Sequence, residues 1–441
     1  MFQTLKNAFK VKEIRNGLLF TFFVLIIVRL GSLIPAPGID TAKIGGALAG
    51  SLGETASEML DAFTGGSISR MTIFALSVTP YITSSIIMQL LTIAIPALEE
   101  MQKDGDEGRK KITAITRIVS IVLAITESLG LTIGFGRSGL LKEYNAFSVT
   151  VIVITLTAGS ALVMWLGERI SERGVGNGIS IILLINIISR IPSDMKSLWE
   201  MFVSGKNVVQ MTFAIIIIVG VILITTILTV ILNDAERRIP VTYAQKVAGR
   251  QRMTGGGHAT HIPLKVNTGN VMPIIFASTL MSIPSIIINL FGIKVTSTVG
   301  NRILEGLNSN YWFRSGYPWA YIGLAIYILL VIFFAYFYTS ISFNPMEISQ
   351  NLKKGGGFIP GIRPGKPTQD YLNAILNYIV IIGAFGLMLV ALIPIFFNGR
   401  FGANVSFGGT SLIIIVGVII ETIKQIESKM VVRNYSGFLN Q

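Results

Sequence analysis

Two glycine-rich stretches contain residue types that could hold a phosphate group. Gly174, Gly176 and Gly178 are closely spaced, but they follow an apolar helical run instead of a strand and lack the spacing of a dinucleotide fingerprint. The stretch 361–366, GIRPGK, is one residue short of a P-loop, and Pro367 stands where Ser or Thr would bind magnesium. Neither stretch therefore predicts a nucleotide site.

The two histidines are the next candidates for metal or acid–base chemistry. His258 and His261 lie in a Gly-rich loop with few carboxylates nearby, and the chain has no cysteine. A zinc ion would lack ligands there, so solvated loop residues are the better interpretation. We expect no catalytic residue, no metal and no cofactor, and hence no enzyme.

Glu127 is the one acidic residue that lies well inside a long apolar run. A secondary transporter would usually place several ionisable groups at mid-membrane to bind its substrate or coupling ion, and a lone carboxylate is a weak coupling site. Glu127 could be neutral, or paired with a neighbouring helix. So little intramembrane charge favours a passage for a large, chemically varied cargo. A transporter of a small solute is the alternative.

These residues belong to a very apolar chain. Hydrophobic residues make up 51% of the sequence, charged residues 13%, and the mean hydropathy is +0.67, which argues against a soluble fold. The apolar runs are continuous, which excludes an alternating β-barrel, and each is close to the roughly 20 residues that cross a bilayer. We predict an all-α integral membrane protein with ten transmembrane helices, at 17–35, 72–95, 112–135, 148–167, 178–192, 211–233, 271–292, 318–341, 373–397 and 408–425.

Lys and Arg are unevenly distributed between the loops. The N-terminus, the C-terminus and alternate loops carry about twice as many basic residues as the other loops, which predicts a cell-membrane protein with both termini in the cytoplasm. Two of these cytoplasmic loops, 233–270 and 342–371, are long and basic. Topology alone would explain their charge, but their length exceeds a simple connection and suggests a docking surface for a polyanionic partner. Arg29 and Arg117 lie in or at the ends of spans, where snorkelling or pairing must relieve the cost.

The loop between the first two spans, 36–70, contains a short amphipathic pattern. Its apolar residues share one helical face: Ala56, Met59, Leu60 and Phe63. Gly65 and Gly66 then end the helix. One interpretation is an interfacial amphipathic segment. The other is a short helix folded back into a cavity.

Several motifs of the chain resemble the SecY family, the central subunits of protein-conducting channels. The longest are FALSVTPYITSSIIMQLL at 74–91 and ERGVGNGIS at 172–180. The others are PAP at 35–37, FTGGSIS at 63–69, HIPLKV at 261–266, PIIFAS at 273–278, FIPGIRPG at 358–365 and FGGTSL at 407–412. The matches extend over nearly the full length, and the ten spans, inward termini and two long loops agree with the family.

The resemblance implies two pseudo-symmetric halves, 1–195 with spans one to five and 196–441 with spans six to ten, around an hourglass pore. The waist would be a ring of aliphatic side chains that closes around an extended chain without hydrogen-bonding it. By alignment with the family, this ring is Val78, Ile82, Leu183, Ile187, Ile275 and Ile414. The amphipathic outer segment becomes the family's plug, about 56–69, with Gly65 and Gly66 as its hinge.

A lateral gate is implied between spans two and three on one side and spans seven and eight on the other. It would let an apolar segment partition into lipid. The available polar gate residues are Thr83, Ser84, Gln89, Glu127, Ser278 and Thr279. The family often has Gln where this chain has Glu127, and we hypothesise that Glu127 is protonated or hydrogen-bonded across the closed gate.

The resemblance also assigns partners. The two basic loops would bind the ribosome or the SecA motor through Arg250, Arg252, Lys353, Lys354 and Arg363. Further implied partners are the SecE and SecG subunits, signal-sequence-bearing preproteins and membrane lipid, with SecDF and YidC as accessory proteins. A narrower alternative is a paralogue dedicated to a few substrates, which the ordinary loop lengths disfavour.

Overall fold

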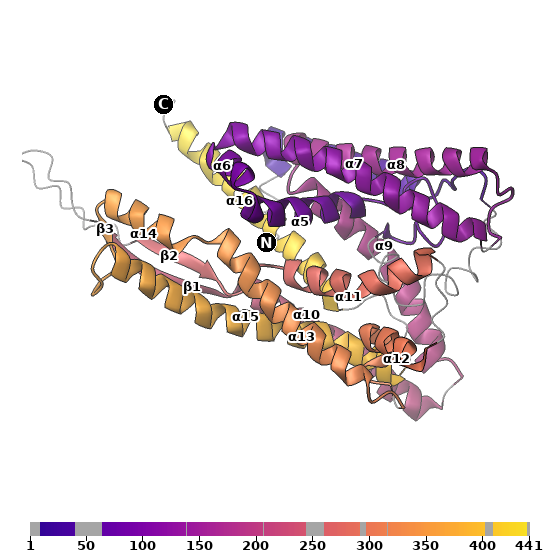
Figure 1. Cartoon of the computed structure of the whole chain (residues 1–441). Coiled ribbons are helices and arrows are strands. Elements are labelled where there is room, and N and C mark those ends of the chain that lie inside the picture. Colours follow the sequence, from indigo (N-terminus) through magenta and orange to yellow (C-terminus); the bar gives the residue numbers. More distant parts are fainter. Residues whose placement is uncertain are drawn as a thin grey trace, which may run out of the picture.

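The structure of the chain is a computed structural model, which describes residues 9–39, 64–137, 139–205, 207–243, 260–291, 297–314, 316–401 and 409–438 (Figure 1). The described residues are mostly helical. Ten longer helices coincide with the ten apolar runs: α2 (Lys12–Gly31), α5 (Thr79–Ala94), α7 (Asp106–Arg137), α8 (Ala146–Arg173), α9 (Gly178–Phe202), α10 (Val208–Asp234), α11 (Met272–Phe291), α13 (Ala320–Ser342), α15 (Lys366–Phe401) and α16 (Gly409–Phe438). Shorter helices are α6 (Pro96–Lys103), α12 (Thr298–Leu307), α14 (Pro345–Lys354) and the 3-10 turn η1 (Ser309–Tyr311).

Length and apolar composition identify the helices that can cross a bilayer. Among the described residues seven qualify alone, in α2, α7, α8, α9, α10, α13 and α15. The bent pair α5 and α6 raises the number to eight, and α11 contributes a shorter apolar segment, Met272–Met281. The chain is thus a multi-spanning helical membrane protein. The count of ten spans agrees with the ten longer helices and stays a prediction.

The ends of several helices differ from the apolar runs. The second run was expected to be helical from residue 72, but α5 begins at Thr79, because residues 65–78 form turns in which Met71 and Ser77 have positive φ. Helix α9 continues through Pro192 to Phe202, so the expected boundary between the halves at 195 falls inside a helix. Hydropathy marks the apolar part of a helix and not its polar ends.

A small sheet is the one departure from the all-helical prediction in the described part of the chain. Strand β1 (Glu236–Tyr243) pairs antiparallel with β2 (Thr260–Lys265), with Ile239 opposite Ile262. The short β3 (Gly357–Phe358) pairs with the other edge of β1, which gives the order β2-β1-β3. The two ends of the basic loop 233–270 and the middle of the basic loop 342–371 are therefore joined in one sheet.

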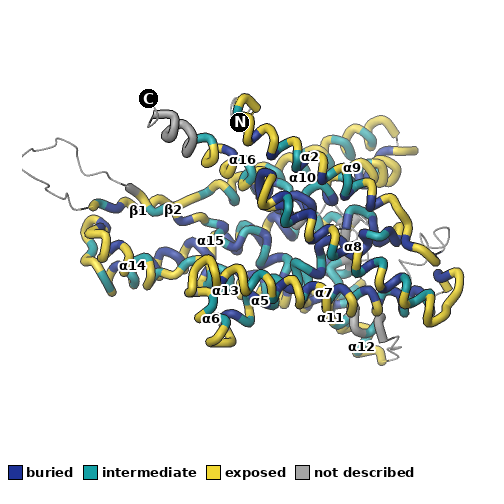
Figure 2. The backbone as a smooth tube through the Cα atoms, turned by 90° about the horizontal axis from the view of Figure 1, so that it is seen from above, coloured by how far each residue is buried: buried dark blue, intermediate teal, exposed yellow. Residues whose placement is uncertain are grey.

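The helices divide by sequence into two groups (Figure 1). Helices α5, α7 and α8 lie on one side and α10, α13 and α15 on the other; α11 lies between them, and α9 runs from the first side towards α12. The sheet, α14 and α6 lie at one end of the molecule, and α12 lies at the opposite end. Buried residues face inwards, and exposed ones follow the outer sides of the helices (Figure 2). On α10 most of the exposed residues are apolar, such as Ile216 and Ile227, as expected of a helix surrounded by apolar groups of lipid or of another helix.

Candidate pore and lateral gate

The six aliphatic residues expected to form the pore ring lie in one hydrophobic cluster. Val78, Leu183, Ile187 and Ile414 are buried in it, and Ile82 and Ile275 are partly buried and pack against it. They come from four places in the chain: the start of α5, the first half of α9, the first turn of α11 and α16. Segments from both halves of the sequence therefore meet here. Their role as a ring stays a prediction, because the cluster also contains residues such as Val163 and Leu387.

Glycines bring α9 close enough to take part in this cluster. A Cβ at Gly178 would clash with the carbonyl oxygen of Gly167 in α8, so only glycine fits the crossing. Gly176 has a φ of +84°, which other residues rarely adopt. Asn177 caps α9: its Oδ1 accepts hydrogen bonds from the backbone N–H groups of Ile179 at 3.2 Å and Ser180 at 3.3 Å. This stretch is a tight connection between two helices.

The start of α5 is held by a buried polar contact that the sequence analysis did not predict. Asn186 of α9 donates from Nδ2 to the Oγ of Ser77 at 3.0 Å, and Ser160 of α8 donates from Oγ to the Ser77 carbonyl at 3.0 Å. Ser77 has a φ of +50°, an uncommon conformation for a residue other than glycine. The contacts place the next residue, Val78, against α9. A lone Asn in the run IILLINII was the available signal.

Most of the expected plug, Ala56, Met59, Leu60 and Phe63, lies outside the described residues. Gly65 and Gly66 are described, and both have positive φ, +68° and +82°. A Cβ at Gly65 would lie 3.0 Å from both Cα and the carbonyl oxygen of Asn186 and 3.0 Å from Nη1 of Arg29. The last part of the expected plug, at Gly65, thus packs against α9. The hinge role of the two glycines stays a prediction.

The helices of the expected gate are arranged as two pairs. Helix α5 packs against α7, α11 packs against α13, and α7 contacts α11 between the pairs. Figure 1 shows α5 and α7 side by side above α11 and α13. The two pairs therefore meet along a seam where α7 contacts α11, which is where the resemblance predicts the gate.

The polar residues on α5 are satisfied mainly within their own helix. Thr83 Oγ1 donates to the Thr79 carbonyl at 3.1 Å, and the buried Ser84 donates to the Tyr81 carbonyl at 2.8 Å. Gln89 differs, because its Oε1 is buried without a hydrogen-bond partner in the described part of the chain. Thr79 Oγ1, in the first turn of α5, is likewise buried without a hydrogen-bond partner among the described residues.

On the facing helices, Ser278 of α11 hydrogen-bonds with the buried Tyr327 hydroxyl of α13. Thr279 and Glu127 are half-buried. No described residue hydrogen-bonds to the Glu127 carboxyl, so a bond across the gate is not observed. The protonated form stays a prediction.

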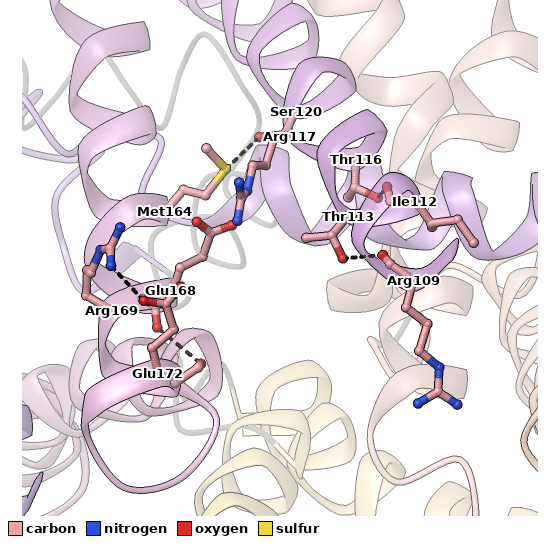
Figure 3. A network of polar contacts seen from close by, with 12 residues as sticks. Arg109, Ile112, Thr113, Thr116, Arg117, Ser120, Met164, Glu168, Arg169 and Glu172 are labelled. Atoms are coloured by element: carbon pink, nitrogen blue, oxygen red, sulfur yellow. Dashed lines mark hydrogen bonds and ion pairs between the residues drawn. The ribbon is translucent and has the colours of Figure 1, made fainter. Parts of the chain in front are cut away.

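Figure 3 shows how α7 is fixed to α8. Arg117 Nε donates to Glu168 Oε1 at 2.6 Å, and one turn along α7 Ser120 Oγ donates to Met164 Sδ at 3.4 Å. An arginine at position 117 was expected to snorkel or to pair, and the structure shows that it pairs. Arg29 on α2 is different, because its Nη1 is buried without a hydrogen-bond partner among the described residues.

The described parts of the two basic loops share an apolar base. Ile239 and Val241 of β1 and Leu264 of β2 pack on Leu352 of α14 and Leu372 of α15. This base holds the sheet on the helices.

The described docking candidates are exposed above that base. Lys353 and Lys354 are the last residues of α14. Arg363 lies in a turn, and its backbone carbonyl accepts a hydrogen bond from Thr368 Oγ1 at 2.8 Å. Arg250 and Arg252 lie outside the described residues. His261 was expected in a loop, but it lies in β2, where it is exposed. His258 lies outside the described residues.

Helices converging on an aliphatic cluster, with two helix pairs meeting beside it, define a channel-like helical membrane protein. The SecY family profile matches residues 72–423. Relatives named protein translocase subunit SecY are 41% identical in Thermotoga maritima (100% of this chain, 98% of the relative), 42% in Streptomyces scabiei (100% of both) and 40% in Mycobacterium tuberculosis (98% of both). The chain belongs to the SecY family. It is a channel subunit of the protein translocase and not an enzyme.

Solved structures share the fold. A protein-conducting channel matches with a TM-score of 0.62 at 19% identity, over 96% of this chain and 94% of that one. A SecY channel studied for its plug domain matches with a TM-score of 0.64 at 20% identity and the same coverage. Sec61 in the canine ribosome-channel complex matches with a TM-score of 0.59 at 19% identity, also over 96% and 94%. At these identities the likeness concerns the fold alone.

Proposed function

We propose that the six aliphatic residues are the constriction through which this channel passes unfolded preproteins. The observation that carries the proposal is their convergence, from α5, α9, α11 and α16, on one hydrophobic cluster. Aliphatic side chains offer no hydrogen bond to a passing chain, so transport does not depend on its sequence. The same side chains exclude water and ions when they close on each other.

The seam between the pairs α5–α7 and α11–α13 is the proposed lateral gate. A segment in the pore beside an open seam chooses between water and lipid by its apolar surface. An apolar segment leaves sideways, and a polar one continues across the membrane. The plug, about 56–69, is proposed to cover the resting pore, with Gly65 and Gly66 as the positions where the chain turns.

The end that carries β1, β2, β3 and α14 is the proposed cytoplasmic docking face, with both termini on the same side of the cell membrane. Exposed Lys353, Lys354 and Arg363 supply positive charge there. Solved proteins of similar fold include the canine Sec61 and yeast Ssh1 channels bound to ribosomes. We propose the ribosome and the SecA motor as partners at this face, with SecE and SecG as partner subunits.

The test is a reconstituted translocation assay. Proteoliposomes containing the full chain, SecE and SecG receive SecA, ATP and a signal-bearing preprotein, and protected preprotein is measured after protease treatment. We expect protection that needs both ATP and the signal sequence. Accumulation of a small solute without preprotein protection would instead support the transporter alternative.

A further inference from the structure

Helix α12 lies at the end of the molecule opposite the sheet and contacts both α11 and α13 (Figure 1). Its exposed residues include two aliphatic side chains one turn apart: Val299 is 65% exposed and Ile303 is 58% exposed. The apolar helix α13 begins shortly after, at Ala320, so α12 lies where the chain enters the membrane. Exposed aliphatic residues on a short helix next to the end of a membrane-spanning helix indicate that the short helix lies in the membrane interface.

Two exposed arginines, one in α12 and one shortly after it, are each held by aromatic rings. The guanidinium carbon of Arg302 lies 4.9 Å from the centre of the Trp319 ring. That of Arg314 lies 5.9 Å from the rings of both Tyr311 and Tyr317. A cation over an aromatic face keeps its full charge while its position is restricted.

No described carboxylate neutralises either arginine through an ion pair. The nearest acidic residue along α12, Glu305, accepts a hydrogen bond from Nε1 of Trp319 at 2.8 Å. That bond fixes the ring on which Arg302 rests. The result is a patch of positive charge, aromatic rings and aliphatic side chains, which we call the α12 patch and define as Val299, Arg302, Ile303, Arg314 and Trp319.

We propose that the α12 patch binds the phosphate-bearing headgroup of an anionic phospholipid in the leaflet opposite the sheet. The guanidinium groups present forked N–H donors that match phosphate oxygens. Val299 and Ile303 reach the upper part of the acyl chains, and the aromatic rings lie at the headgroup level. A soluble phosphate would use the same arginines but would gain nothing from the aliphatic pair, so the exposed Val299 and Ile303 favour the lipid.

The location of the patch gives this lipid a consequence for the gate. Helix α12 packs against α11 and α13, which form one side of the proposed gate. A bound headgroup restrains α12 in the plane of the interface and with it the adjoining ends of both helices. This proposal needs only the membrane location of the chain, so its failure and the failure of the proposed transport function are separate results.

The first measurement tests whether the helix is inserted. The chain has no native cysteine, so Val299→Cys gives one site for a polarity-sensitive fluorophore. Asn301→Cys, also exposed and on another side of the helix, is the matched control. In vesicles of phosphatidylcholine with phosphatidylglycerol we expect a blue-shifted emission at 299 and little shift at 301. Equal emission at both positions would overturn the insertion of α12.

The second measurement tests the headgroup. Quenching of the label at 299 by brominated phosphatidylglycerol and by brominated phosphatidylcholine gives the preference for the anionic lipid. Each arginine near an anionic surface contributes about a fivefold preference, so Arg302→Gln with Arg314→Gln should lower it by about 25-fold. The control pair, Lys142→Gln with Lys196→Gln, removes the same charge from two other exposed sites and should change it little. An equal loss in both pairs would overturn the proposal.

Two further measurements separate lipid binding from binding of a soluble anion and from loss of folding. Soluble glycerol phosphate should not abolish the preference, and complete competition by it would show a soluble-anion site instead. If the glutamine pair lowers the thermal unfolding temperature, Arg302→Lys with Arg314→Lys replaces it. That pair keeps the charge and loses the planar fork. A preference below that of the unmodified chain supports the arginine site, and an unchanged preference overturns it.

Discussion

The hydrogen bond between Asn186 and Ser77 ties α9 to the start of α5, and its removal should have a measurable cost. The donor and acceptor lie 3.0 Å apart, and the two residues are 1% and 3% exposed, so water cannot replace the lost partner. A buried polar group left unpaired costs about 1–3 kcal/mol. We expect Asn186→Ala and Ser77→Ala each to lower the free energy of unfolding by about that amount.

A double-mutant cycle separates this bond from other effects of the substitutions. Both single variants and the double variant are unfolded in mixed detergent micelles, and we expect the double variant to lose about 1 kcal/mol less than the sum of the single losses. Thr132→Ala is the control, because buried Thr132 Oγ1 donates to the carbonyl of Ser128 within its own helix at 2.7 Å. Its effect should add to that of Asn186→Ala within about 0.5 kcal/mol.

The same bond has a predicted effect on the closed channel. Ser77 precedes Val78, so a looser Ser77 allows the first ring residue to move away from α9. We expect Asn186→Ala channels in planar bilayers to leak ions in the absence of preprotein, and Thr132→Ala channels to stay closed. Strict additivity of Asn186→Ala and Ser77→Ala, together with an unchanged ion leak, would refute the reasoning.

Three further predictions concern the helices and the docking face. Gly178→Ala should sharply reduce the amount of folded protein in the membrane, because the new Cβ would clash with the α8 backbone. Gly220→Ala on α10 places its Cβ in open space, so it should raise the free energy of unfolding by about 0.5–1 kcal/mol. Expression level and thermal unfolding measure both effects. Arg117→Gln should lower the free energy of unfolding by about 1 kcal/mol or less, because the ion pair with Glu168 is partly exposed. The double variant Arg117→Glu with Glu168→Arg exchanges the two charges and should restore most of this loss. A larger loss that the exchange does not restore would contradict this account. Arg363→Glu should reduce SecA binding and translocation but not membrane insertion of the chain; normal motor binding would remove the docking role.

The apolar runs predicted the helical class and nearly all of the long helices, because about 20 apolar residues in sequence have few other stable arrangements. They could not predict the ends. Helix α15 begins at Lys366, ahead of the apolar run that starts at 373. Its first turns are polar, so hydropathy does not mark them as part of the helix. The sheet was missed because β1 and β2 are short and contain Pro240 and Pro263, which weaken a strand pattern.

The candidate site could be predicted only in part. Aliphatic residues such as Ile187 and Ile414 look like ordinary core in the sequence, and it was the resemblance that singled them out. The Asn186–Ser77 bond joins residues 109 positions apart, and no local pattern predicts such a contact. The pairing of Arg117 was easier to anticipate, because an arginine within an apolar helix needs a partner or a path to water.

The central claim is that the six aliphatic residues surround the passing chain, and site-specific crosslinking tests it most directly. The chain lacks cysteine, so Ile187→Cys and Ile414→Cys can each be combined with a preprotein that is stalled in transit and carries one cysteine. Val163→Cys is the control, because Val163 is fully buried in the same cluster but is not one of the six. We predict disulfide formation with the stalled preprotein at 187 and 414 and none at 163. Equal crosslinking at all three positions, or none at 187 and 414, would contradict the account.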